Sequence, residues 1–232
     1  MKTHAVRKRS YDHERTPPAA PAADTRTNTQ KVMGFFGEVL ELSLHPAEAA
    51  AREVEDPCAG YKSGLLNLVP SFLMAFLFFG LLVLAAPPMV LAGQAVPPWA
   101  AWLFGGVVMS LSYAFMALVV TITIYLMARL AGGSGKVGAL WHLVTKLMVL
   151  LNLLWLLAGL LSPYLPGIKV GGTSYSVGQV AVDLYFVWAL ALMLPGVFGL
   201  SKYRAIAVSV LFWALSLALS VLTSGMTTAA AA

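Results

Sequence analysis

Residues 63–128 contain no Asp, Glu, Lys or Arg in 66 consecutive positions. About 20 apolar residues are enough for one helix to cross the ~30 Å hydrocarbon core of a bilayer. The stretch is therefore too long for one span and long enough for two. The pairs Pro87-Pro88 and Pro97-Pro98 mark the predicted loop between them.

The rest of the composition agrees with a membrane protein. Of the 232 residues, 59% are hydrophobic and 11% are charged, whereas a soluble domain carries about 25% charged residues. Residues 1–62 hold 18 of the 25 charged side chains, and the remaining 170 residues hold 7. These numbers exclude an ordinary soluble enzyme and predict a polar head attached to a membrane-embedded body.

The apolar runs predict an all-α polytopic membrane protein with five transmembrane helices in a bundle. The membrane domain covers residues 63–223, and residues 224–232 form a short C-terminal tail. The predicted spans are residues 65–86, 99–127, 138–161, 179–200 and 205–223.

The head divides into two parts. Residues 1–30 are rich in Pro, Ala and charge and lack aliphatic periodicity, which predicts a disordered tail without a cleavable signal peptide. Residues 31–62 predict two short amphipathic cytoplasmic helices, the second opened by Pro46. Their polar face is acidic, whereas helices that bind anionic lipid usually have a basic one. We therefore expect these helices to pack against the cytoplasmic rim of the membrane domain.

The basic residues predict the orientation. With the N-terminus inside, the inner segments hold thirteen Lys and Arg residues and the outer segments hold only Lys169. This distribution places the N-terminus in the cytoplasm and the C-terminus on the opposite side. Because the basic residues do not cluster, the formal charge of +5 does not indicate a nucleic-acid partner.

Three ionisable residues within the predicted spans form the candidate intramembrane site. His142 and Lys146 are four residues apart on the third span and share a face, and Asp183 lies in the fourth span. Such residues are functional candidates because each costs about 2.5–3.5 kcal/mol at mid-bilayer. Three interpretations remain. In the first, which the depth of the two residues in their spans favours, Lys146 and Asp183 each extend to the nearer membrane interface. In the second they form a structural ion pair, and in the third His142, Lys146 and Asp183 together form an ion or proton site.

Hydroxyl groups on the second span extend this candidate set. Tyr113, Thr121 and Tyr125 lie mostly on one side of the helix. They predict hydrogen bonds between packed helices more strongly than a substrate path.

The sequence offers no recognisable catalytic site. Residues 132–136, Gly-Gly-Ser-Gly-Lys, lack the first glycine and the Ser or Thr of a phosphate-binding loop. A single cysteine, Cys58, cannot form an internal disulfide or a multi-cysteine metal site. We therefore expect no enzyme activity, cofactor or metal.

Three segments resemble the Yip (Ypt-interacting protein) domain family, in its bacterial-type branch. They are the head residues 44–57 before the first span, the inner turn at residues 128–136 and the late turn at residues 199–205. The resemblance covers about residues 44–223 and implies a compact five-helix domain with a cytosolic N-terminus, here in a bacterial inner membrane. The eukaryotic members bind lipid-modified GTPases, but their Asp-Leu-Tyr-Gly-Pro signature is absent: Asp183-Leu184-Tyr185 is followed by Phe186.

Together these features predict a non-enzymatic membrane organiser or adaptor. Its partners would be the lipid bilayer and a membrane or cytosolic protein, or a second copy of the chain. The alternatives are a small transporter or ion-conducting protein that uses His142, Lys146 and Asp183, and an accessory subunit of a larger complex.

Overall fold

The computed structural model describes residues 28–56, 60–85, 90–91, 94–170 and 173–230. Most of the predicted disordered tail and Cys58 lie outside these residues. Residues 28–30, which were assigned to the tail, already belong to the first helix.

Five long helices form the body, and each is long and apolar enough to cross a membrane. The all-α class is thereby confirmed. The helices are α3 (Tyr61–Ala85), α4 (Pro98–Leu130), α5 (Val137–Leu161), α6 (Val177–Phe198) and α7 (Lys202–Ala230). The last helix continues into the residues that were assigned to a C-terminal tail.

Two short antiparallel hairpins replace the plain loops expected between the spans. The first pairs β1 (Val90–Leu91) with β2 (Gln94–Ala95). The second pairs β3 (Gly167–Val170) with β4 (Thr173–Ser176) in a register that places Gly167 opposite Ser176. A short 3₁₀ helix, η1 (Ser162–Tyr164), joins α5 to β3.

Local signals in the sequence set the ends of α6. Ser176 and Gln179 form a capping box, in which each side chain bonds the other residue's backbone N–H. Gly199 ends the helix at φ 68°, a left-handed conformation that glycine adopts without steric cost. The next turn is tied to the α4–α5 turn, because Ser134 N donates to the Phe198 carbonyl (3.0 Å).

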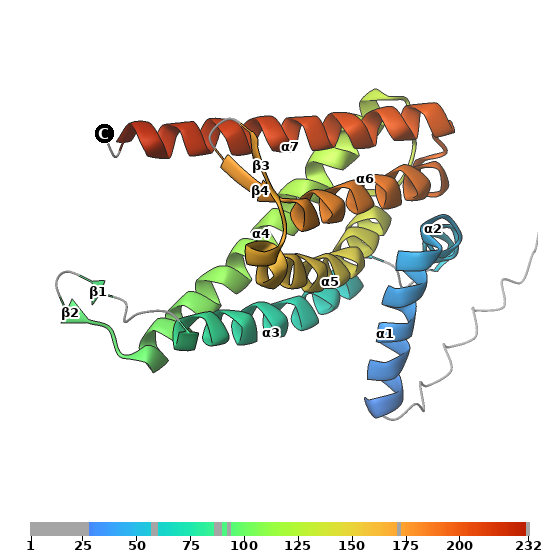
Figure 1. The fold of residues 1–232 in the computed structure, drawn as a ribbon. Coiled ribbons are helices and arrows are strands. Elements are labelled where there is room, and N and C mark those ends of the chain that lie inside the picture. The colour runs from blue at the N-terminus through green and yellow to red at the C-terminus, as the bar shows by residue number, and fades with distance from the viewer. Residues whose placement is uncertain (1–27, 57–59, 86–89, 92–93, 171–172, 231–232) are drawn as a thin grey trace, which may run out of the picture.

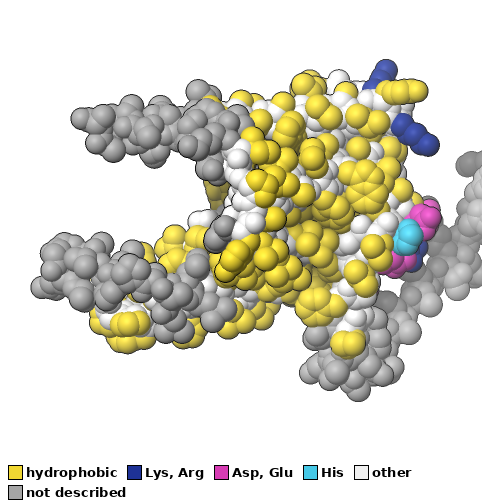
Figure 2. All heavy atoms as spheres, in the orientation of Figure 1, with side chains coloured by type: hydrophobic (Ala, Val, Ile, Leu, Met, Phe, Trp, Pro, Cys, Tyr) yellow, Lys and Arg dark blue, Asp and Glu magenta, His cyan; other side chains and the backbone are white. Residues whose placement is uncertain are grey.

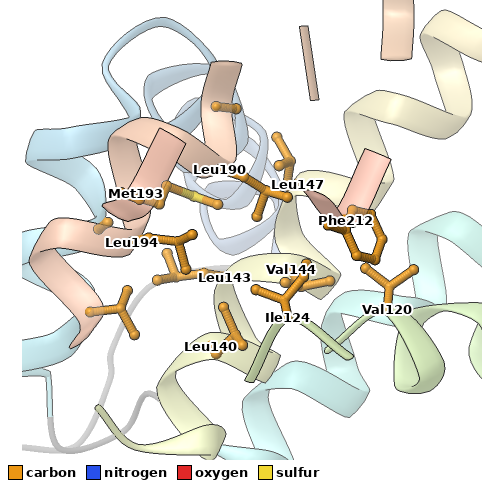
Figure 3. Close-up of a cluster of buried hydrophobic side chains, with 14 of the residues drawn as sticks. Val120, Ile124, Leu140, Leu143, Val144, Leu147, Leu190, Met193, Leu194 and Phe212 are labelled. Atoms are coloured by element: carbon orange, nitrogen blue, oxygen red, sulfur yellow. The ribbon is translucent and has the colours of Figure 1, made fainter. Parts of the chain in front are cut away.

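The core forms around the N-terminal half of α5. Residues 139–147 are all buried, so this part of the helix is enclosed on every side. Leu140, Leu143, Val144 and Leu147 pack against side chains from α4, α6 and α7 (Figure 3). The neighbouring core residues are Ile124, Leu190, Met193, Leu194 and Phe212.

The outside of the bundle is as apolar as its inside. On α4 alone, Phe104 is 76% exposed, Leu111 62% and Phe115 66%. Figure 2 shows the hydrophobic side chains covering the length of the bundle, with the visible charged side chains gathered at one end. Monomeric soluble proteins rarely expose apolar surface on this scale.

The head consists of α1 (Asn28–Leu44) and α2 (Pro46–Glu55). It lies at the same end of the bundle as the α4–α5 and α6–α7 turns, while β1, β2 and the C-terminus lie at the other end (Figure 1). Helix α1 runs across the direction of the long helices. Helix α2 packs against α6, where the buried side chains of Ala49 and Ala50 are small enough to allow close approach.

Candidate functional site

A polar cavity of about 300 Å³ separates the head from the bundle. Helices α1 and α2 supply one wall, and α3 and α5 supply the other. Its lining residues are Glu38, Glu41, Ala49, Arg52, Glu53, Asp56, Ser63, Asn67, His142 and Lys146.

The Lys146 side chain lines this cavity and is only 3% exposed. Its Nζ donates to Glu38 Oε2 at 2.9 Å and also contacts Glu53 Oε1. The Lys146 ammonium thus ends among carboxylates of the head and not in solvent. The two carboxylates of the head neutralise the ammonium where it is buried, so the side chain does not have to reach solvent.

His142 lies one helical turn before Lys146 and contacts the same carboxyl group. Its Nε2 is 2.9 Å from Glu53 Oε2. On the other side of the ring, the Asn67 Nδ2 amide lies 3.3 Å from Nδ1 and 3.2 Å from the His142 carbonyl. An amide N–H group can only donate, so Nδ1 is the acceptor and the proton of neutral His142 is on Nε2, facing Glu53.

Glu53 connects the whole cluster because each of its oxygens contacts a different α5 side chain. Burial raises the pKa of Glu53, but hydrogen bonds from His142 and Lys146 and the positive charge of Lys146 lower it more, and the net pKa is about 2. Glu53 is therefore ionised at any physiological pH. One ammonium is shared by two carboxylates, and the neutral imidazole supplies a further donor.

The cluster is suited to holding two parts of the chain together. Among the described residues, no group of three His, Cys, Asp or Glu side chains is placed to hold a metal ion. Each α5 side chain of the cluster already has a partner from the head or from α3. This arrangement fixes the position of the head on the five-helix bundle.

The structure separates the six candidate residues predicted from sequence. It brings His142 and Lys146 together, but Asp183 lines a different cavity that shares no lining residue with theirs. Tyr113 lines a third cavity, beside Asn152 and Gln179.

The two remaining candidates, Thr121 and Tyr125, contact groups of the helices themselves. Thr121 donates a hydrogen bond to the Ala117 carbonyl of its own helix (2.7 Å). The Tyr125 ring packs against Phe198 and lies 5.8 Å from the Arg129 guanidinium carbon.

Sequence reasoning missed Glu38 and Glu53 as members of the site. A signal for Glu53 is present, because Pro46, Ala49 and Ala50 are buried and Glu53 follows them at the i, i+3, i+4, i+7 spacing of one helix face. A carboxylate on the buried face of a helix needs a buried cation, and Lys146 is a buried cation on a neighbouring helix.

No family model, curated protein or solved structure matches this chain. The Yip-domain resemblance therefore stays a prediction from short motifs.

We predict that Glu53→Ala frees the head from the bundle. Removing one partner of a buried ion pair costs about 3–5 kcal/mol, because the other charge remains buried and uncompensated. Hydrogen exchange of the α2 amides in the purified full chain should show a loss of opening free energy near the lower end of that range. Combining Glu53→Ala with Lys146→Met should cost less than the sum of the two single changes.

Arg52→Ala is the matched control for this experiment. Arg52 pairs with Glu41 in the same head, but both side chains are exposed, at 61% and 45%. An exposed pair contributes about 0–1 kcal/mol, so exchange should change little. Equal effects of Arg52→Ala and Glu53→Ala would refute the special role of Glu53.

A pH dependence follows from the lowered pKa of Glu53. The group binds a proton more readily in the undocked head, where its pKa returns to the ordinary 4.5, than in the docked head, where it is about 2. Its stabilisation is therefore complete above pH 4.5 and is lost as the pH falls toward 2. Hydrogen exchange of α2, corrected for the intrinsic rate, should show weaker protection at pH 3 than at pH 6. The same decline in Glu53→Gln would contradict this assignment.

Proposed function

We propose that this protein is a non-enzymatic integral membrane adaptor. Helices α3 to α7 cross the bilayer, and the head, held at the cytoplasmic face, recruits a protein partner to the membrane. One observation carries the proposal: a docked helix of the head presents an apolar stripe that no described part of the chain covers.

The stripe is made by Met33, Phe36, Leu40 and Leu44 of α1. These side chains are 70%, 51%, 56% and 61% exposed. At about 100° per residue they fall within one third of the helix circumference. The neighbouring face, with Val39 and Leu42, is buried in the structure. Helix α1 thus packs on one side and leaves a second apolar side open.

A protein partner accounts for this stripe better than lipid does. On the surface of the head, Glu41, Glu48 and Glu55 are acidic and Arg52 is basic, whereas Glu38 and Glu53 are paired with Lys146. Helices that lie on anionic membranes usually have a basic polar face, and the cytoplasmic leaflet is negatively charged. An apolar stripe with i, i+3, i+4 anchors is also the pattern by which a helix fills a hydrophobic groove on another protein.

The proposed topology has the N-terminus in the cytoplasm of a bacterial cell and the C-terminus across the inner membrane. Arg129, Lys136, Lys202 and Arg204 lie in or next to the two turns at the end of the bundle that holds the head. Basic residues concentrate on the cytoplasmic side of membrane proteins. The Yip-domain resemblance points the same way.

A small transporter or ion-conducting protein is the second candidate, because His142 and Lys146 do lie together beside a polar cavity. It is the weaker proposal for two reasons. The head neutralises Lys146, and the cavity of Asp183 shares no residue with that of Lys146. Membership of a larger complex as an accessory subunit is compatible with the adaptor proposal.

Site-specific photocrosslinking in cells tests the adaptor role. A photoreactive amino acid at Leu40 should give a defined protein adduct, and one at the exposed Glu48 of α2 should not. The crosslinked protein, once identified and purified, should bind the full chain in detergent. Phe36→Glu should weaken this binding by about tenfold or more, since burying a Phe side chain contributes about 1.5–3 kcal/mol.

Glu41→Gln is the control for that variant, because it changes charge on α1 away from the stripe. An adduct of twice the chain mass would identify a second copy as the partner. The proposal is wrong if Leu40 gives only lipid adducts, or if Phe36→Glu and Glu41→Gln bind the partner equally well.

A further inference from the structure

A second cavity, of about 240 Å³, lies between α4, α5, α6 and α7. It contains Asp183, six residues after the start of α6 at Val177 and thus in the half of the bundle away from the head. Its lining residues are Val120, Trp155, Tyr175, Asp183, Phe186, Phe212, Trp213, Ser216, Leu217 and Ser220.

Aromatic residues make up half of the residues that line this cavity. They come from four elements: Trp155 from α5, Tyr175 from β4, Phe186 from α6, and Phe212 and Trp213 from α7. The Phe186 and Phe212 rings pack edge to face, with centroids 5.9 Å apart. The Tyr175 hydroxyl and Ser220 Oγ lie 2.8 Å apart and connect β4 to α7. The wall is thus built from packed and hydrogen-bonded groups.

Asp183 is the one charged residue among those that line the cavity. Within the described part of the chain, its carboxylate has no hydrogen bond or ion pair. A carboxylate in apolar surroundings is costly unless a cation compensates it. The serine hydroxyls do not do so: Ser216 donates to the Phe212 carbonyl (3.0 Å), and Ser220 is paired with Tyr175.

We propose that this cavity binds an organic ammonium group. The carboxylate of Asp183 supplies the opposite charge, and the faces of the aromatic rings attract a cation through their quadrupoles. Aromatic cages are the usual means by which proteins recognise quaternary ammonium groups. A bare divalent cation fits poorly, because Ca²⁺ takes about 6–8 oxygen ligands and this cavity offers one carboxylate and hydroxyls already in use.

The size of the cavity limits the ligand. Sites for drug-sized molecules measure about 300–1,000 Å³, and this one is smaller. It suits a small amine or the ammonium headgroup of a lipid. Both sources present the same chemistry to Asp183, and the proposal covers that shared group.

Binding of choline to the purified full chain in an uncharged detergent tests the proposal. Titration calorimetry should show saturable binding. The uncharged isostere 3,3-dimethylbutan-1-ol should bind about tenfold or more weakly, because it keeps the shape of choline and lacks its charge. Asp183→Asn should cause a similar loss for choline, and Asp183→Glu should retain most of the binding.

Two tryptophan variants are matched controls. Trp213→Leu removes a ring from the cavity wall and should weaken choline binding. Trp188→Leu changes an exposed tryptophan of α6 that does not line the cavity and should have no effect. Size-exclusion profiles equal to that of the wild type show that each variant is folded.

Nanodiscs distinguish the two sources of the ammonium group. If the occupant is a lipid headgroup, choline should bind more weakly in phosphatidylethanolamine or phosphatidylcholine discs than in phosphatidylglycerol discs, and Asp183→Asn should abolish the difference. Equal choline affinity in all discs identifies a free amine.

The proposal is overturned if choline does not bind saturably in any setting, if the isostere binds equally well, or if Asp183→Asn and Asp183→Glu behave alike. None of these outcomes depends on the head, so they leave the adaptor proposal untouched.

Discussion

The position of the head depends on one buried ammonium group. Lys146 lies within α5, where the residues around it are buried and mostly apolar. Its charge is tolerated there because Glu38 and Glu53 reach it from α1 and α2. The bundle and the head depend on each other at this point. Among the described residues, the Lys146 ammonium has no carboxylate partner other than Glu38 and Glu53, and Glu53 contacts His142 and Lys146 of α5. An electrostatic interaction between distant parts of the sequence therefore gives the head a defined place on the bundle.

The rest of the architecture is compatible with an apolar environment around the bundle. Large side chains such as Phe104 and Phe115 point outward, while polar contacts lie inside or at the ends. Hydroxyl groups within the long helices mostly bond the carbonyl one turn earlier, as Thr121 and Ser209 do. These bonds satisfy the hydroxyl without a partner on another helix. The surroundings of Lys146 and of Asp183 are exceptions, because each contains a charged side chain; the first holds the head in place and the second is the proposed ammonium site.

Much of the fold was predictable from local patterns. Long apolar runs, prolines at helix ends and the capping residues of α6 are local signals in the sequence. The number of long helices and most of their ends can therefore be predicted from the sequence alone. The α2 helix also occupies the residues predicted for it, because Pro46 opens it and Asp56 follows its end. The sequence does not predict the hairpins, because their strands are only two to four residues long. Such short strands show little alternation of apolar and polar residues.

The site was less predictable because its partners lie far apart in the sequence. The i, i+4 spacing placed His142 and Lys146 on one face, but nothing in their neighbourhood indicates Glu38 or Glu53, which are 108 and 93 residues from Lys146. The depth of Lys146 in its own span favours snorkelling when the span is considered alone. The sequence does not show that the head covers the end of the bundle and brings two carboxylates to the ammonium. The separation of Asp183 from Lys146 likewise depends on how the helices pack.

The most direct test of the account is a distance measurement between the head and the bundle. Spin labels at Glu48 of α2 and Tyr203 of α7, both exposed, would be placed in a Cys58→Ser background, and double electron–electron resonance recorded in lipid nanodiscs. We predict one narrow distance distribution for the otherwise native chain and a broad one when Glu53→Ala is added. A broad distribution in the native chain, or a narrow one that survives Glu53→Ala, would contradict the claim that this ion-pair cluster holds the head in place.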